Sequence, residues 1–399
     1  MYRSLTKNEI TNRLRRFQNR LQTHGVDGAI IVQKVDLYYL SGTDQDAHLW
    51  VPALDSPLLM VRKSVERAKM DSPVEAIVPL SGFSHLPELI KQHTEKLPKR
   101  LGLEMDVLPA AIYQIYRRLF PDVELVDISF LIRDVRMTKS AYEISCIEGA
   151  VEMADHMFEK IPEFLAESGT ETDLALRVEA FYRGEGHPGF VRTRAFNMGL
   201  SYGHIMAGPN AAMPSGSGGP TGGRGLGPFH SQGAGRGKIR DKEPVVVDYT
   251  SNVEGYISDQ TRIFAPGGVK EEFHRAHDVM LEVQERVAQR GSSGSRAGDL
   301  YDEAIKIVER AGLTEGFMGH PEPVPFIGHG VGLELDEWPV IARGSETIIE
   351  EGMVMALEPK MVFPGQGVVG IENMFLVTNN GMKKLNRFPD AISILAKIT

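Results

Sequence analysis

The sequence lacks three features that would each define its class. Its single cysteine, Cys146, cannot form an internal disulfide, which is typical of proteins from a reducing compartment. No run of 18 apolar residues is present, and the first 22 residues lack the apolar core of a signal peptide. Lys and Arg number 44 against 53 Asp and Glu, a net charge of -9, so no basic footprint for nucleic acid or an anionic membrane exists. We therefore expect a cytoplasmic protein with neither kind of partner.

The length of 399 residues indicates more than one domain. Apolar residues at helical spacing predict an amphipathic helix that ends near Gln22. Strand-like segments then alternate with helical ones, at 28–32, 37–42, 57–61, 101–105 and 123–127. Such alternation predicts an α/β domain over residues 1–135.

The remaining sequence predicts a second domain over residues 139–399. It opens with a long helical pattern at 139–166, for which Thr138 or Ser140 is a suitable cap. Further helical patterns follow at 171–184, 269–291 and 297–312, with β-rich segments between and after them. Helices mixed with runs of strands are typical of an α+β domain.

A glycine-rich segment, residues 216–237, interrupts the second domain. It has ten glycines in 22 residues, a composition that opposes regular secondary structure. One interpretation is a flexible surface loop, and the other is a lid or wall over a site. A Walker-type phosphate loop is excluded because no GK[ST] follows.

Two predicted hairpins each place a pair of acids on one sheet face. In VVVDYTSNVEGYISDQTRIF, a turn centred between Val253 and Glu254 puts Asp248 opposite Asp259. In the segment around PGQG, a turn centred near Gly365 puts Glu358 opposite Glu372. Directly paired strand residues have Cβ atoms about 4.5–5.5 Å apart.

These four carboxylates need positive counter-charge. One buried acid in a strand is usually satisfied by an arginine or by backbone amides, but four together need more than one such partner. His329 lies between glycines in FIGHGVGLELDEWP, which would let backbone and metal approach closely. Oxygen ligands with one imidazole suit Mn, Co, Fe or Zn, and the pattern leaves the metal's identity open.

The order Asp248, Asp259, His329, Glu358, Glu372, within DQTRIF, GHGVGLELDE, LEP and GIEN, resembles the M24 metallopeptidases, which include methionine aminopeptidase, aminopeptidase P and prolidase. The resemblance covers residues from about 139 to 399 and implies the pita-bread fold. GVDGAIIVQKVDLYYLSGT is similar to the creatinase/prolidase N-terminal domain.

The resemblance implies an Xaa-Pro peptidase that holds two divalent ions and acts on short peptides. Asp259 and Glu372 would bridge the ions, Asp248 would hold one ion, and His329 with Glu358 would hold the other. The ion pair would acidify a bridging water and polarise the substrate carbonyl, with Glu358 as proton shuttle. Relatives are often dimers built through the N-terminal domain, so we expect a homodimer.

Three positions depart from the peptidase pattern. Ser215 stands where AGPNAAMPSG would carry a histidine, Asp336 replaces the histidine that stabilises the tetrahedral intermediate, and Gly370 replaces an arginine frequent in proline-specific members. An ionised Asp336 cannot donate to a developing oxyanion, although it could act as a catalytic base. His204 or His230 could supply a replacement imidazole to the substrate.

These departures leave alternatives open. One is variation within the peptidases, and another is a lyase or small-amide hydrolase on the same metal site, like the dimethylsulfoniopropionate lyases or creatinase. DEWP is similar to the acid-containing segment of those lyases, at a spacing one residue longer. A metal-free binding protein is the third alternative, but it has no reason to keep mutually repelling carboxylates.

Overall fold

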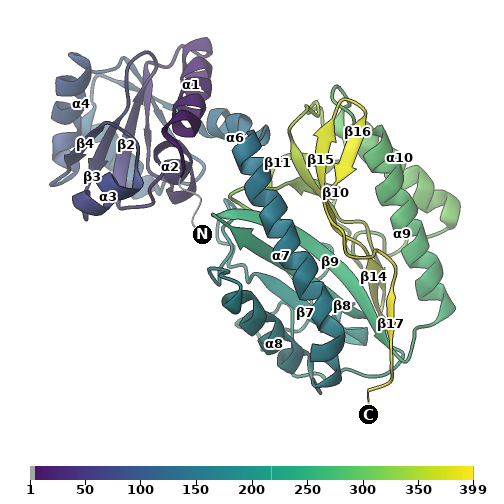
Figure 1. Cartoon of the computed structure of the whole chain (residues 1–399). Coiled ribbons are helices and arrows are strands. Elements are labelled where there is room, and N and C mark those ends of the chain that lie inside the picture. Colours follow the sequence, from purple (N-terminus) through teal and green to yellow (C-terminus); the bar gives the residue numbers. More distant parts are fainter. Residues whose placement is uncertain (1–4, 217, 399) are drawn as a thin grey trace. The chain divides into compact units, whose positions relative to one another are not determined.

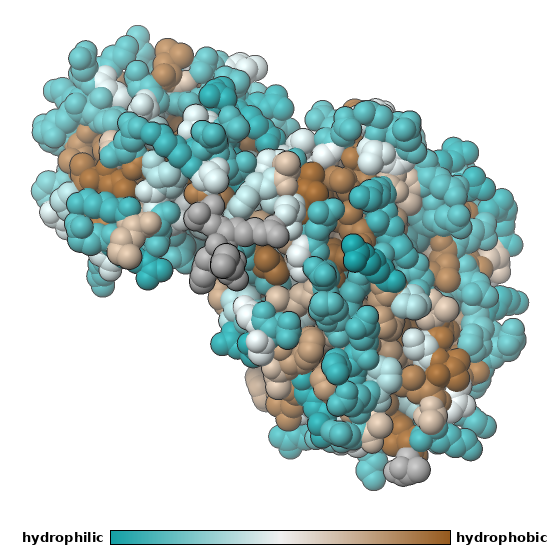
Figure 2. All heavy atoms as spheres, viewed as in Figure 1, coloured by the Kyte–Doolittle hydropathy of each residue, from teal (hydrophilic) through white to brown (hydrophobic). Residues whose placement is uncertain are grey.

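The computed structural model describes residues 5–216 and 218–398, in two compact units, residues 1–136 and 137–399. Figure 1 shows the helices and strands of both units. No helix among the described residues is long and apolar enough to cross a membrane. Hydrophilic residues cover most of the face of both units seen in Figure 2.

The first unit contains one sheet with strand order β4-β3-β2-β1-β5-β6. Strand β2 runs antiparallel to β1 and β3, and the other neighbours are parallel. The strands are β1 (Gly28–Ile31), β2 (Ala47–Pro52), β3 (Leu58–Val61), β4 (Ala76–Pro79), β5 (Arg100–Leu103) and β6 (Glu124–Asp127). The helices are α1 (Lys7–Thr23), α2 (Lys34–Ser41), α3 (Val65–Asp71), η1 (Phe83–His85), α4 (Leu86–Thr94), α5 (Ala110–Leu119) and α6 (Ser129–Met137). This is the α/β arrangement that the sequence predicts.

Helix α1 forms because its apolar residues recur every three or four positions. Ile10, Leu14, Phe17 and Leu21 are all buried. The side chain of Thr6 caps the first turn by accepting from the backbone N–H of Glu9. The predicted amphipathic helix is confirmed.

The prediction of a strand at 37–42 is wrong, because this segment belongs to helix α2. The side chain of Gln33 accepts from the backbone N–H of Asp36 at the helix start, and Gly42, at φ 82°, ends the helix. Most of its residues are buried. A short helix buried nearly all round has no amphipathic period to distinguish it from a buried strand.

The described residues of the second unit form helices and three sheets. Its helices are α7 (Ala141–Ala166), α8 (Glu171–Gly184), η2 (Gly208–Asn210), α9 (Glu271–Arg290) and α10 (Ala297–Ala311). Its first strands are β7 (Gly203–Ala207), β8 (Val245–Val253), β9 (Tyr256–Pro266), β10 (Phe326–Gly330), β11 (Glu337–Ala342) and β12 (Val354–Leu357). The remaining strands are β13 (Lys360–Phe363), β14 (Gly367–Gly370), β15 (Asn373–Thr378), β16 (Gly381–Lys384) and β17 (Ser393–Leu395).

Each half of the second unit has its own apolar core between a helix pair and a sheet. Helices α7 and α8 pack on the β17-β9-β8-β7 sheet, and helices α9 and α10 pack on the strands from β10 to β16 (Figure 1). Helix α7 begins at Ser140, which forms a capping box with Glu143. The two helix-covered halves form the predicted α+β pita-bread fold.

Candidate metal centre

Asp248 and Asp259 lie on the β8–β9 hairpin, but they are not directly opposite each other. Asp248 pairs with Thr261, so the predicted direct pairing was wrong by two residues. The turn lies one residue later than predicted, at Glu254 and Gly255, whose φ values of 54° and 88° suit a two-residue hairpin loop. Because an offset of two residues keeps side chains on one face, the two acids remain diagonal neighbours.

Glu358 and Glu372 lie across from each other, as the sequence predicts. Leu357 pairs with Asn373 immediately beside them, and the β13–β14 ladder continues in the same register beyond them. The acids themselves occupy the short gap between these two ladders. The turn around Gly365 therefore has the predicted position.

The two hairpins meet at the acids. Thr261 of β9 and Glu372 exchange backbone hydrogen bonds of 3.3 Å in each direction. The Thr261 hydroxyl also donates to Oε2 of Glu372 at 2.8 Å. This bridge holds the acid of one hairpin against the strand that carries Asp259.

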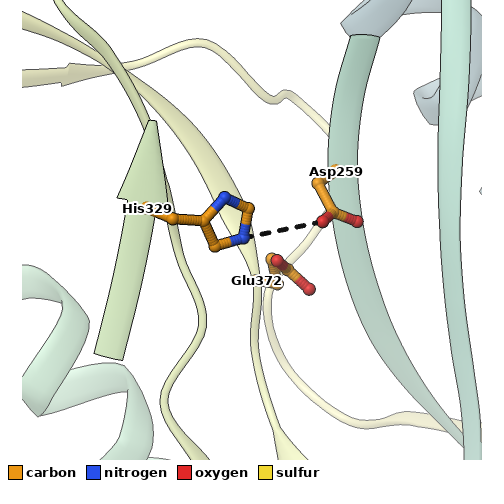
Figure 3. Close-up of side chains that lie close together, drawn as sticks. All are labelled: Asp259, His329 and Glu372. Carbon is orange, nitrogen blue, oxygen red and sulfur yellow. Dashed lines mark ion pairs between the residues drawn. The ribbon is translucent and has the colours of Figure 1, made fainter. Parts of the chain in front are cut away.

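His329 reaches the same cluster from β10. Its Nε2 lies 3.8 Å from Oδ2 of Asp259 and 3.6 Å from Oε1 of Glu358. Figure 3 shows the imidazole pointing toward Asp259, with Glu372 beside both residues. Nδ1 lies 3.1 Å from the carbonyl oxygen of Gly330. That contact assigns the ring proton to Nδ1 and leaves Nε2 free to bind a metal.

The glycines beside His329 serve strand packing. A Cβ on Gly328 would lie 2.5 Å from the carbonyl oxygen of Ala356, and one on Gly330 would lie 2.2 Å from that of Trp338. The glycines therefore allow the neighbouring strands to approach the backbone, whereas the sequence suggested that they make room for a metal. These glycines fix the position of His329 between β11 and β12.

The donor atoms fit a divalent ion. One ligand atom each from Asp259, His329 and Glu372 lies within 4.8 Å of the others, and all three residues are buried. Glu358 adds a fourth buried donor next to His329. Oxygen donors with one imidazole suit first-row divalent ions, which would supply the positive charge that buried carboxylates require.

Lys360 is a member of the cluster that the sequence analysis missed. Its Nζ lies 2.9 Å from Oε2 of Glu358, 3.0 Å from Oε2 of Glu372 and 3.3 Å from Oδ2 of Asp248. The lysine is 2% exposed, so its charge is balanced by these carboxylates and not by water. It is two residues after Glu358, and the period of a strand places both on one face. The two-residue spacing from Glu358 is the sequence signal that could have identified Lys360.

Burial and mutual repulsion shift the pKa values of the cluster. Burial raises the pKa of Asp259 well above its ordinary value, and Glu372 raises it further. Burial also raises the pKa of Glu372 to about 7, against the lowering effect of Lys360. Burial alone would lower the pKa of Lys360, but the surrounding carboxylates outweigh it and hold the pKa well above its usual range. The lysine is therefore an ammonium ion.

The acids line a cavity of about 720 Å³ together with all the predicted substrate-binding residues, His204, Ser215 and His230. His204 lies directly across from Asp248 on the β7–β8 ladder. Its Nδ1 has no hydrogen-bond partner among the described residues, and burial lowers its pKa. His230 lies on the glycine-rich loop, and Ser215 donates to the carbonyl oxygen of Ser231 in the same loop.

The glycine-rich segment forms one wall of this cavity. The described residues between Asn210 and Val245 contain neither helix nor strand, as the sequence predicts. Gly216, Pro220, Phe229 and His230 are among the cavity-lining residues of this segment. Of the two interpretations that the sequence left open, the wall of a site is the one the fold supports.

Asp336 lies at the edge of the same cavity. Its Oδ1 is 3.9 Å from Nδ1 of His329, on the side of the ring away from Asp259. Its side chain is 47% exposed. This carboxylate is therefore close to His329 and also open to the cavity.

The fold and these donors define a metal-dependent hydrolase of the pita-bread class. The pattern that describes metallopeptidase family M24 matches residues 145–379, and that of the creatinase/prolidase N-terminal domain matches residues 13–138. The chain belongs to metallopeptidase family M24.

The similarity extends over nearly the whole chain. An Xaa-Pro dipeptidase of Pyrococcus furiosus is 28% identical over 377 residues, 94% of this chain and 97% of that protein. The solved prolidase structure from Pyrococcus furiosus has a TM-score of 0.76 at 28% identity, covering 93% of this chain and 99% of that chain. The Xaa-Pro aminopeptidase structure from Thermotoga maritima, at 22% identity and a TM-score of 0.78, shares the fold and covers 96% of this chain and 99% of that chain.

Proposed function

We propose that this protein is a divalent-metal-dependent peptidase that hydrolyses the bond before proline in short peptides. The observation that carries the proposal is the buried set Asp259, His329, Glu358 and Glu372 at a cavity of about 720 Å³. The chain that presents it is similar over almost its full length to an Xaa-Pro dipeptidase. A cavity of this volume suits a small ligand such as a short peptide.

Each residue of the cluster has a separate role in this proposal. A divalent ion held by the cluster would acidify a water and polarise the scissile carbonyl. Asp259, His329, Glu358 and Glu372 would hold that ion, and Asp248 supports the cluster from β8. Glu358 would also serve as the general base, because its Oε1 lies 3.6 Å from Nε2 of His329, on the side of the cluster where the ion would bind.

Substrate groups would be positioned by the cavity wall. His204 has a free ring nitrogen, and His230 lies on the loop that closes one side. Either imidazole can donate a hydrogen bond to a substrate carbonyl or carboxylate. Ser215 and Asp336, which stand where the family's peptidases carry histidines, are weaker donors. In this proposal, His204 and His230 take over the donor role of the replaced histidines.

The test is turnover of a panel of Xaa-Pro dipeptides and tripeptides after reconstitution with Mn, Co, Fe or Zn. Bound metal is quantified in parallel, and matched Xaa-Ala peptides and the Glu358→Gln variant serve as controls. Cleavage of the Xaa-Pro peptides alone, lost in Glu358→Gln, is the expected result. Bound metal without any cleavage before proline would overturn the substrate assignment.

A non-peptidase activity, a lyase or a small-amide hydrolase, is the second candidate function. The observation in its favour is Asp336, an acid beside His329 where the family's peptidases carry a second histidine. A carboxylate there can abstract a proton from a bound substrate. Turnover of dimethylsulfoniopropionate or creatine by protein that leaves the peptide panel intact would establish this alternative.

The finer expectations rest on the composition, the donor types and the family resemblance. The metal is proposed to be Mn, Co, Fe or Zn, and the protein is proposed to be a cytoplasmic homodimer that binds neither nucleic acid nor membrane. Metal analysis of the purified protein tests the identity of the metal, and sedimentation of the intact chain tests the dimer.

A further inference from the structure

The Lys360 ammonium occupies one side of the acid cluster. It contacts Oδ2 of Asp248 and Oε2 of Glu372, at 3.3 Å and 3.0 Å. In the two-ion scheme that the resemblance implies, Asp248 and Glu372 are ligands of the same ion. The lysine therefore sits on oxygens that this ion would need.

The opposite side of the cluster has its donors turned away from the lysine. Lys360 takes Oε2 of Glu358, whereas Oε1 of the same carboxylate faces His329. Lys360 and Thr261 both donate to Oε2 of Glu372, so Oε1 is the oxygen available to an ion. The two glutamates thus divide their oxygens between an ammonium side and a metal side.

We infer that this chain holds one divalent ion, on Asp259, His329, Glu358 and Glu372, and that Lys360 replaces the second ion. The inference rests on the metal dependence in the proposed function. The four carboxylates of the cluster carry at most four negative charges, and the lysine with one divalent ion supplies three positive charges. A second divalent ion beside the ammonium would meet a like charge at contact distance.

Asp248 then has a different role from the one that the resemblance implies. It is the partner of Lys360, and it acts on the metal only through the position of that lysine. A residue of this kind costs about 10–100-fold in metal affinity when it is changed, whereas loss of a direct ligand costs more.

The test is the number of ions bound by the full-length protein, measured by mass spectrometry of the metals after equilibration with excess Mn²⁺ or Zn²⁺ and removal of free metal. We expect one ion per chain in the wild type and two in Lys360→Met, which removes the charge but keeps an unbranched side chain. Lys360→Arg keeps the charge and is expected to stay at one ion. The electron paramagnetic resonance of the Mn²⁺ protein should show isolated ions in the wild type and spin-coupled pairs in Lys360→Met.

Two outcomes overturn the inference. One is two ions in the wild type, and the other is one ion in both the wild type and a folded Lys360→Met. If Lys360→Met does not fold, the Asp248→Asn variant decides. One bound ion with affinity within about 100-fold of the wild type supports the lysine's role, and loss of an ion or of all binding contradicts it.

The result is independent of the substrate assignment. A one-ion protein that cleaves no Xaa-Pro peptide overturns the proposed function and leaves this inference standing. A two-ion protein that cleaves such peptides overturns this inference and leaves the proposed function standing.

Discussion

Gly370 lies directly across the β13–β14 ladder from Lys360. A Cβ on Gly370 would lie 2.5 Å from the carbonyl oxygen of Pro359 and 2.7 Å from Cα of Lys360. The position at which proline-specific relatives often carry an arginine therefore has no room for a side chain here. The buried cation comes from the facing strand, at Lys360.

Gly370→Ala is expected to destabilise the protein. The atoms that the new methyl group would meet are backbone atoms, which cannot rotate away, so the ladder beside Glu372 must shift. Overpacking of this kind costs about 1–3 kcal/mol of unfolding free energy. Thermal or denaturant unfolding measures it. Gly184→Ala is the control, because a Cβ there meets nothing within 4 Å, and an equal loss in both variants would contradict the steric account.

Much of the fold was predictable because its periodic patterns are long. The helices at 141–166, 171–184, 271–290 and 297–311 lie within about two residues of their predicted bounds. Helix α2 was the exception, because burial of nearly all its residues removed the amphipathic signal. A hydrophobic pattern predicts a helix or strand best where one face of the element is buried and the other is exposed to solvent.

The metal centre was predictable to the extent that hairpin registers were. The turn at Gly365 fixed Glu358 opposite Glu372, whereas a one-residue error in the first turn moved the partner of Asp248 from Asp259 to Thr261. The acids stayed on one face because that error shifts a ladder by two. Lys360 was not predictable from the ligand motif, which identifies only metal donors, although its position two residues after Glu358 places it on the same face.

Asp259→Asn is expected to lower activity and raise the stability of the metal-free protein. Asp259 is buried among carboxylates that raise its pKa, so the neutral amide removes repulsion, on the order of 1 kcal/mol. The same change removes a direct metal ligand, and we expect kcat/KM to fall by about a hundredfold to a thousandfold, as for loss of one group that stabilises charge in the transition state. Unfolding in chelator and turnover with added metal measure the two effects.

The Asp259→Asn result has an informative control in Asp173→Asn, which removes an acid at the capping box of α8. That variant should lose stability and keep its metal. Falling stability of metal-free Asp259→Asn would show that the aspartate is held by favourable partners and is not a strained ligand.

Asp336→His is expected to keep or raise cleavage of Xaa-Pro peptides. The side chain is 47% exposed to the cavity edge, so an imidazole can be accommodated, and it adds a donor for the developing oxyanion. An increase of up to about tenfold in kcat corresponds to one neutral hydrogen bond gained in the transition state. Steady-state kinetics on one dipeptide give the answer, with Asp336→Asn as the variant that removes charge alone. A large fall in both variants would make Asp336 a catalytic base.

His48 makes the first unit sensitive to acid. The ring is buried against the edges of Phe83 and Tyr116, and neither nitrogen has a hydrogen-bond partner among the described residues. Burial lowers its pKa from 6.5 to about 4, with Arg62 adding to the shift and Asp46 opposing it. Between those pH values the unfolded chain binds a proton that the folded chain excludes.

Stability is therefore complete above pH 6.5 and falls as the pH drops toward 4, by about 1.4 kcal/mol per pH unit from this residue. His48→Phe removes the titrating group and should flatten that part of the profile. Denaturant unfolding of the wild type and the variant at pH 7.5 and 5.5 measures the loss of stability in each. Burial also lowers the pKa of His187 to about 4. Because His187 is present in both proteins, its contribution cancels in the difference between them. His85→Gln, an exposed histidine of the same unit, should leave the profile unchanged. An equal loss of stability between pH 7.5 and 5.5 in the wild type and in His48→Phe would show that protonation of His48 does not cause the acid sensitivity.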